Sequence, residues 1–314
     1  MKKYSSASAY KNTHQTAVTI GTFDGVHLGH KAILKRLVET AKKENLDSVV
    51  LTFFPHPRMV LQQNVDIKLI NTIDERTDLL ENTGLDHLVI HPFTHAFSRL
   101  TALEYVRDIL VNSLKAKKII IGYDHRFGRN RNAAIEDLRE FGKTYNFEVE
   151  EISAKEIDDV AISSTKIRKA LTEGDVETAN GFLGYHFMIS GKVVEGKAIG
   201  RTINYPTANL KVGESYKLIP KNGVYVVQSK MDEKRIFGIT SIGTNPTIGG
   251  TEKTIETHFL DFNKELYGQE ITIEFLKFIR DEETFDSLAT LKREIEKDEQ
   301  FAKHFLKNRG EISF

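Results

Sequence analysis

The chain has 314 residues, 40% of them hydrophobic and 28% charged, with 44 basic and 44 acidic side chains. This composition is that of an ordinary globular protein of about two domains. The charges balance, so no net field attracts the chain to nucleic acid or to an anionic membrane. The absence of cysteine excludes disulfide scaffolds, thiolate zinc sites and cysteine nucleophiles. The polar first residues and the lack of a long apolar segment predict a cytoplasmic protein without a membrane span.

The first half of the chain alternates short apolar runs with amphipathic stretches. Residues 1–16 are predicted to be an N-terminal extension. The predicted strands that follow are 17–23, 48–53, 87–93, 117–123 and 147–152, and the predicted helices are 28–43, 73–83, 102–114, 134–145 and 163–173. This rhythm predicts an α/β domain, residues 17–183, with a parallel sheet and helical crossovers. Ligands of such sheets bind beyond the carboxyl ends of the strands, near the switch in strand order.

After Leu183 the pattern changes to short β-type runs separated by glycine, proline and asparagine. The predicted strands are 187–195, 223–230, 235–242, 253–262 and 270–279, followed by an amphipathic helix over 284–308. Short strands with frequent turn residues predict a small antiparallel barrel that ends in a helix. We place the boundary between the two predicted domains near Gly184, so that the second domain is residues 184–314.

The sharpest local motif is Gly-Thr-Phe-Asp-Gly-Val-His-Leu-Gly-His over residues 21–30, at the end of the first predicted strand. Its glycines let the backbone approach a phosphate, and free amides at a helix start favour an anion. His27 and His30 are three residues apart and can project from one side of the first helical turn. A turn with two incidental histidines and a metal site are the alternatives, but no third ligand is evident nearby.

This motif resembles that of the nucleotidyltransferase superfamily, and in its full length that of the prokaryotic bifunctional FAD synthetases. The resemblance implies a Rossmann-like domain in which His27 and His30 hold ATP phosphates while AMP is transferred to FMN. Residues 52–57 (TFFPHP), 122–128 (GYDHRFG) and 162–168 (ISSTKIR) match further family segments in order. The implied binding residues are Gly21, Phe23, Asp24, Gly25, Phe54, Asp124, Phe127, Ser163, Ser164, Thr165 and Arg168. His125 replaces a family phenylalanine, and Ala133 lies where a glycine is usual.

The second half resembles riboflavin kinase. Residues 191–201 are glycine-spaced and basic, which suits a flap over ATP phosphates, and they supply the implied binding residues Lys192, Gly196, Gly200 and Arg201. The family signature Pro-Thr-Ala-Asn follows, in which Thr207 and Asn209 bind the nucleotide and offer hard oxygen atoms to Mg²⁺. In residues 256–262 (ETHFLDF), Glu256 corresponds to the base that deprotonates the ribityl hydroxyl of riboflavin. Asn204 and Asn245 replace the usual glycine and arginine.

Together these motifs predict an enzyme that uses ATP and Mg²⁺ to convert riboflavin into FMN and FMN into FAD. The expected partners are small molecules, with no nucleic acid and no membrane, and the sequence does not indicate an oligomeric state. Three alternatives stay open: an adenylyltransferase with a degenerate, flavin-binding barrel, a non-catalytic flavin or nucleotide sensor, and an oligonucleotide-binding barrel. The balanced charge and the lack of a basic aromatic stripe disfavour the last of these.

Overall fold

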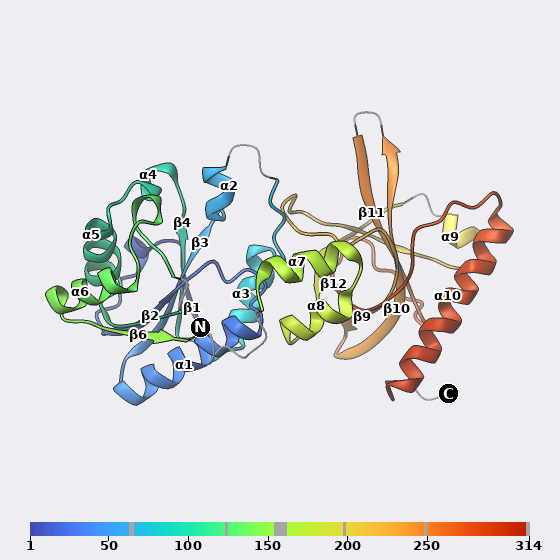
Figure 1. Cartoon of the computed structure of the whole chain (residues 1–314). Helices are drawn as coiled ribbons and strands as arrows, with labels where there is room; N and C mark the ends of the chain where they lie inside the picture. Colours follow the sequence, from blue (N-terminus) through green and yellow to red (C-terminus); the bar gives the residue numbers. More distant parts are fainter. Residues whose placement is uncertain (63–65, 123–124, 154–161, 197–198, 248–249, 312–314) are drawn as a thin grey trace. The chain divides into compact units, whose positions relative to one another are not determined.

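The structure is a computed structural model that describes residues 1–62, 66–122, 125–153, 162–196, 199–247 and 250–311 (Figure 1). The chain forms two compact units, residues 1–164 and 165–314. Each unit has its own sheet and its own buried core.

The first unit is built on a six-stranded sheet in the order β1-β4-β3-β2-β5-β6. Every neighbouring pair in it is parallel. Its strands are β1 (Lys2–Tyr4), β2 (Thr16–Ile20), β3 (Asp47–Phe54), β4 (His87–Pro92), β5 (Ala116–Gly122) and β6 (Glu148–Ile152). The chain adds β3 and β4 on one side of β2 and then β5 on the other. The switch point where a ligand is expected therefore lies at the carboxyl ends of β2 and β5.

Helices cover both faces of this sheet because its central strands are apolar on both sides. On one face Leu34 and Leu37 of α1 (Leu28–Glu44) and Leu80 of α3 (Ile73–Glu81) pack with Ala17 and Val50. The other face lies under the 3₁₀ turn η1 (Ala7–Ala9), the π-helix η2 (Tyr105–Ser113) and α6 (Ile135–Tyr145). Shorter pieces are α2 (Pro57–Leu61), α4 (His95–Ser98), α5 (Ala102–Glu104) and η3 (Arg129–Arg131).

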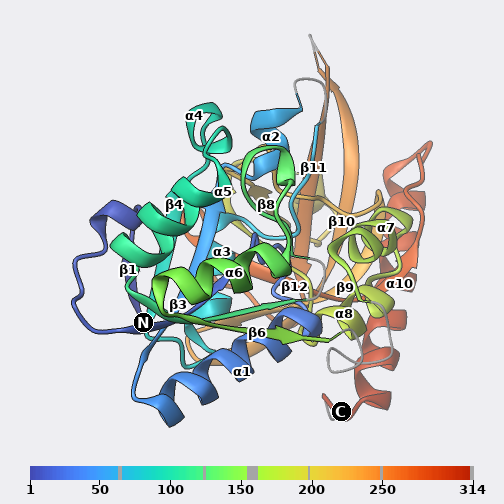
Figure 2. The same cartoon turned by 60° about the vertical axis from the view of Figure 1, so that its left-hand side comes forward.

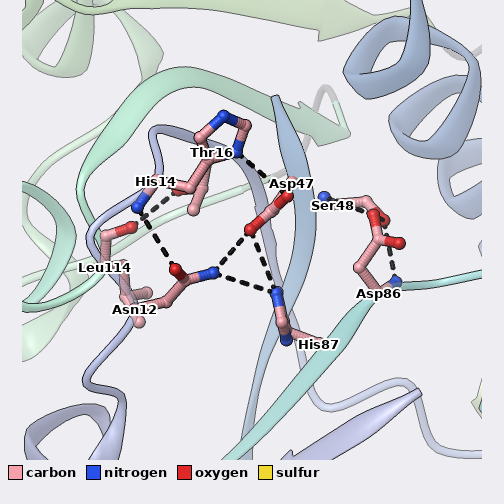
Figure 3. Close-up of polar contacts among 8 residues, drawn as sticks. All are labelled: Asn12, His14, Thr16, Asp47, Ser48, Asp86, His87 and Leu114. Atoms are coloured by element: carbon pink, nitrogen blue, oxygen red, sulfur yellow. Dashed lines mark hydrogen bonds and ion pairs between the residues drawn. The ribbon is translucent and has the colours of Figure 1, made fainter. Parts of the chain in front are cut away.

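The segment before β2 is an integral part of the first unit. Strand β1 pairs with β4, and Tyr10 is 3% exposed in the core. At the amino ends of β3 and β4 the Asp47 carboxylate accepts hydrogen bonds from Asn12 Nδ2 at 2.5 Å, and it lies 3.2 Å from His87 Nε2 (Figure 3). His14 Nδ1 lies 3.1 Å from the same carboxylate. These contacts anchor the segment at the end of the sheet opposite the switch point.

The second unit contains a closed antiparallel barrel in the order β10-β11-β8-β7-β12-β9. Its strands are β7 (Met188–Val194), β8 (Ala208–Lys211), β9 (Gly223–Met231), β10 (Lys234–Thr247), β11 (Gly250–Phe259) and β12 (Glu270–Arg280). Inward residues such as Ile189, Val227 and Phe275 are fully buried, as the filled interior of a small barrel requires.

Four helices accompany the barrel: α7 (Ser164–Glu173), α8 (Val176–Leu183), α9 (Ile199–Thr202) and α10 (Leu288–Asn308). The last helix runs along the outside of the barrel (Figure 2). Its Ala302 and Leu306 are buried in one cluster with Phe237 and Ile239. Helix α8 is fixed by Asn180, whose side chain donates to Phe275 O at 2.8 Å and accepts from the amide of Phe187 at 2.6 Å.

The predicted fold class is confirmed, and several predicted elements need correction. The predicted helix 102–114 is one short turn, α5, that continues as the π-helix η2. The predicted strand 235–242 continues to Thr247, and the helix predicted from residue 284 begins at Leu288, after its N-cap Ser287. Strands β1 and β8 and helix α8 were not predicted, because segments of three, four and eight residues carry too little periodicity.

Candidate active sites

The loop between β2 and α1 has an unusual backbone. Phe23 and Val26 have φ values of 49° and 35°, and Gly25 between them has a φ of 89°. Positive φ is uncommon for a non-glycine residue and strained for a β-branched one, so the surrounding structure must hold this loop in place. Phe23 and Val26 are both buried. At Gly21 an added Cβ would lie 3.1 Å from the Phe23 ring, so glycine is the residue that fits there.

Buried polar groups brace this loop. Asp24 is 1% exposed, and its carboxylate accepts hydrogen bonds from the amides of Ile70 at 3.0 Å and Asn71 at 3.3 Å. Arg76 is fully buried, and its guanidinium donates to the carbonyl of Thr22. Asp24 is therefore engaged within the protein. Arg76, which we had not singled out from the sequence, holds the other side of the loop.

The two histidines of the motif stack at the start of α1, with ring centroids 3.6 Å apart. His27 is the N-cap, and its Nδ1 accepts the amide of His30 at 3.3 Å. Burial lowers the pKa of His27 to about 4, although Asp24 opposes the shift. Burial, His27 and Arg76 together lower the pKa of His30 well below its ordinary value. Both rings are neutral at neutral pH, and His27 carries its proton on Nε2, because its Nδ1 is an acceptor.

This tautomer suits phosphate recognition. The Nε2–H group of His27 can donate to a phosphoryl oxygen at the positive end of the 17-residue helix α1. A neutral ring also avoids the cost of burying two adjacent cations. Nδ1 of His30 is buried and has no hydrogen-bond partner among the residues that the structure describes.

An aromatic cluster follows strands β3, β4 and β5. The Phe53 ring lies 5.7 Å from Phe93 and 5.5 Å from Phe97, and Tyr105 lies 6.0 Å from Phe97 and 5.9 Å from Phe127. Flat apolar side chains at this end of the sheet suit a flavin ring. The sequence had indicated Phe127 and the neighbouring Phe54. Phe97 and Tyr105 lie in helices outside the matching motifs.

The two departures from the family pattern near this cluster are accommodated. Ala133 and Phe127 exchange both backbone hydrogen bonds, at 3.1 and 3.2 Å, which closes the loop between them without glycine at residue 133. The ring of His125 is nearly parallel to that of Phe127, with centroids 6.1 Å apart. Gly128 has a φ of 71°, and an added Cβ would lie 3.1 Å from the backbone of Ala102. Asp124 lies outside the described residues.

The segment predicted to bind phosphate from a second helix reaches the β2–α1 loop through Ser164. Its hydroxyl donates to the carbonyl of Asp24 at 2.9 Å. Ser163 precedes α7, and Thr165 and Arg168 lie on α7 within the second unit. Phosphate binding by Ser163, Thr165 and Arg168 stays a prediction.

In the barrel, the predicted kinase residues lie together. The Thr207 hydroxyl donates to Glu256 Oε2 at 3.2 Å. Asn209 on β8 is the register partner of Glu256 on β11, so their side chains share one face of the barrel wall. His258, two residues further along β11, contacts the carbonyl of Pro206 through its Nδ1 at 2.9 Å. A hydroxyl, an amide and a carboxylate thus meet where the Pro-Thr-Ala-Asn segment enters the barrel.

Glycines beside this group are required by close contacts. A Cβ at Gly196 would lie 2.2 Å from Nδ2 of Asn209, and one at Gly200 would lie 2.1 Å from the carbonyl of Tyr205. The two basic residues predicted to bind ATP phosphates are not part of this group. Lys192 is exposed on β7, and the guanidinium of Arg201 lies 5.5 Å above the ring of Tyr267 and donates to its hydroxyl at 3.2 Å.

The substitution of glycine by Asn204 has a conformational explanation. Asn204 has a φ of 66°, in the left-handed region that glycine occupies freely and that asparagine tolerates better than most residues. Its side chain is exposed. The left-handed backbone conformation is therefore kept although glycine is replaced. The backbone of Asn245 lies in β10, and its side chain is outside the described set.

Neither a protein-built metal site nor a membrane helix is found in the part of the chain that the structure describes. No three histidine, aspartate or glutamate side chains there are arranged to hold a metal ion. No helix there combines the length and apolar character needed to cross a bilayer.

Fold and sites together define a two-unit enzyme in which a nucleotidyltransferase-type parallel sheet is joined to a kinase-type barrel. The family model of FAD synthetase matches residues 9–166, and that of riboflavin kinase matches residues 183–306. The chain is 39% identical to the bifunctional riboflavin kinase/FMN adenylyltransferase of Buchnera aphidicola, over 94% of this chain and 95% of that protein. The protein of the same description from Listeria monocytogenes is 37% identical, over 92% and 91%.

The chain therefore belongs to the family of bifunctional riboflavin kinase/FMN adenylyltransferases. Its substrates are small molecules, flavins and ATP, and both activities are those of a transferase. A crystal structure described as that of a macrolide-efflux protein from Streptococcus pneumoniae is also similar, with a TM-score of 0.87 and 32% identity over 96% of this chain and 98% of that one. This similarity shows the shared fold, and efflux is the description of that protein alone.

Proposed function

We propose that the two activities are divided between the two halves of the chain, with FMN adenylylation in the parallel-sheet half and riboflavin phosphorylation in the barrel half. The boundary near Gly184 is part of this proposal, and it is supported by the start of the riboflavin-kinase match at residue 183. The observation that supports the kinase half most directly is the contact between Thr207 and Glu256, with Asn209 opposite in register.

In the adenylyl transfer a phosphate oxygen of FMN attacks the α-phosphorus of ATP, and pyrophosphate leaves. No protein nucleophile is needed, so the protein positions two anions and stabilises the developing charge. His27 and His30 are proposed to donate hydrogen bonds to the ATP phosphates as neutral rings. The strained loop that contains Phe23 and Val26 leads into the start of α1, where His27 is the N-cap. The aromatic cluster around Phe97 is proposed to hold the flavin ring.

In the kinase reaction the ribityl 5′-hydroxyl of riboflavin attacks the γ-phosphorus of ATP, and ADP leaves. Glu256 is proposed to take the hydroxyl proton as the new P–O bond forms. Its carboxylate already accepts a hydrogen bond from a hydroxyl, that of Thr207 at 3.2 Å, which is the contact a base needs with its substrate. Because Gly196 has no side chain, the amide of Asn209 can lie directly against its backbone.

The donor set of the barrel fits Mg²⁺. Thr207 and Asn209 offer hard oxygen atoms, and Glu256 adds a carboxylate next to them. Mg²⁺ usually keeps several waters and shares substrate phosphates, so it does not need three carboxylate or imidazole ligands from the protein. When bound, it would neutralise charge on the phosphate oxygens. Thr207 and Asn209 are the residues proposed to hold it.

A reciprocal pair of variants tests this division. Riboflavin and FMN are supplied separately with ATP and Mg²⁺, and the flavin products are separated by chromatography. Glu256→Gln is expected to lose FMN formation while FAD formation from FMN continues, and His27→Asn is expected to do the reverse.

Loss of both activities in either single variant, with the fold intact by circular dichroism, would contradict the division of labour. FAD from FMN without FMN from riboflavin in the unchanged chain would mean that the barrel binds flavin without phosphorylating it. Omission of Mg²⁺ should stop both reactions, and turnover without any divalent ion would remove Mg²⁺ from the proposal.

A further inference from the structure

The residue before Pro206 joins the loop of the kinase site to the C-terminal helix. The phenol of Tyr205 donates a hydrogen bond to Glu299 Oε2 on α10 at 2.9 Å. The other oxygen of that carboxylate, Oε1, lies 2.7 Å from Lys303 Nζ one turn later. The carboxylate is therefore held on its own helix while it holds the phenol.

Tyr205 is also held by its neighbours in the barrel. Its ring meets the ring of His258 edge to face, with centroids 5.0 Å apart and an angle of 66° between the planes. Nδ1 of His258 lies 2.9 Å from the carbonyl of Pro206, and since a carbonyl only accepts, the imidazole is the donor. The amide of Tyr205 bonds to the carbonyl of Gly200 at 2.8 Å. The residue is thus fixed on three sides.

These contacts form a continuous path from α10 to the proposed base. Glu299 fixes Tyr205, the chain passes through Pro206, and the next residue, Thr207, donates to Glu256 at 3.2 Å. A displacement of Tyr205 therefore moves the Thr207 hydroxyl, because one proline, a residue with a fixed φ, separates them.

The protonation states of Tyr205 and Glu299 allow the hydrogen bond between them. Burial and the neighbouring Glu299 carboxylate raise the pKa of Tyr205 to about 12, so the phenol keeps its proton at neutral pH and can donate. Burial acts to raise the pKa of Glu299, but hydrogen bonds from Lys303 and Tyr205 lower it overall, so this residue is an anionic acceptor. A phenol–carboxylate bond of this kind is stronger than one between neutral groups.

We propose that Tyr205 is a positioning residue of the kinase half, whose phenol tethers α10 to the loop that presents Thr207 to Glu256. The inference rests on the proposed roles of Thr207 and Glu256 and deepens them. A phenylalanine at this position would keep the ring contact with His258 but has no group that can bond to Glu299.

The test compares riboflavin phosphorylation by full-length chains carrying Tyr205→Phe, Glu299→Met or both. Each single variant should lower kcat about three- to tenfold, with KM for ATP within about twofold, since one charge-assisted hydrogen bond is lost. The double variant should lose no more than either single one, because both remove the same bond. Glu296→Met is the matched control. Glu296 lies on the same helix and pairs with Lys292 at i,i+4, as Glu299 pairs with Lys303.

FAD formation from supplied FMN should be unchanged in every variant, and the melting temperature should fall by no more than a few degrees, since Ala302 and Leu306 still hold α10 on the barrel. An unchanged kcat for Tyr205→Phe would overturn the tether, and so would losses that multiply in the double variant. If the unchanged chain forms no FMN from riboflavin, the proposed function fails first and the tether fails with it.

Discussion

His27 combines two roles that a single substitution can separate. It caps α1 through Nδ1, and it is the proposed phosphate donor through Nε2. His27→Asn keeps a cap, because an asparagine side-chain oxygen is among the best acceptors at this position. The same substitution removes the imidazole. We expect FAD formation to fall about a hundredfold or more, as when one donor to a developing charge is lost.

The substitution also changes how stability depends on pH, and the sign follows from the lowered pKa. The pKa of His27 is about 4 when folded, against an ordinary value of 6.5. Above the ordinary value neither state binds the proton. As the pH falls below it, the unfolded chain binds a proton that the folded chain refuses. The free energy of unfolding therefore falls by about 2 kcal/mol by roughly pH 5, and by about 3 kcal/mol below the pKa of the folded state.

The assay measures urea unfolding of the first unit within the full-length chain, for the parent and for His27→Asn. It is repeated at several pH values between about 5 and 8. The two proteins should differ little at the upper end, and the variant should be more stable by about 2 kcal/mol at the lower end. Nuclear magnetic resonance of the His27 ring checks the titration directly. An ordinary titration of this ring near pH 6.5, or equal pH dependence of the two proteins, would refute the reasoning.

Three further predictions concern single residues. Gly196→Ala should lower FMN formation about ten- to a hundredfold in a steady-state assay, because its Cβ would displace the Asn209 amide, whereas Gly213→Ala, with nothing within 4 Å, should not. Asp298→Ala should cost about 2 kcal/mol in urea unfolding, because it breaks a buried two-bond contact with Arg280 at 2.8 and 3.0 Å. Asp24→Ala should abolish FAD formation and spare the kinase, since the β2–α1 loop loses its bonds to Ile70 and Asn71, and equal loss of both activities would contradict this.

The sequence was sufficient for the fold class because the two halves differ in hydrophobic period. Apolar runs such as residues 49–54 and 119–121 indicate buried strands, and the amphipathic stretch of α1 indicates a helix. Strand β1 could not be predicted, since three residues paired at a sheet edge have no pattern of their own. The π-helix η2 was also not predicted, because nine residues are too few for the apolar pattern to distinguish i→i+5 from i→i+4 hydrogen bonding.

For the sites, the resemblance assigned Thr207 and Glu256 to one kinase site, and the two side chains are in contact although 49 residues separate them. The contacts that could not be predicted from the sequence are those of buried side chains. The hydrogen bond that the Asp24 carboxylate accepts from Ile70, and the brace from Arg76 on a helix with no motif, could not be read from the sequence. The tautomer of His27 required knowing which atom faces the amide of His30. The hydrogen bond from Tyr205 to Glu299 joins residues that are 94 positions apart, and no motif links them.

Strand β1 has a consequence for the protein's resistance to aggregation. It occupies the outer edge of β4, whose unpaired backbone groups would otherwise invite another extended chain to add on. Because β1 is only three residues long, little edge is left for such addition once it is in place. Removal of the segment up to Tyr10 would expose the apolar strand β4 at the edge of the sheet. A chain shortened in this way should therefore aggregate, and an affinity tag is better placed at the C-terminus.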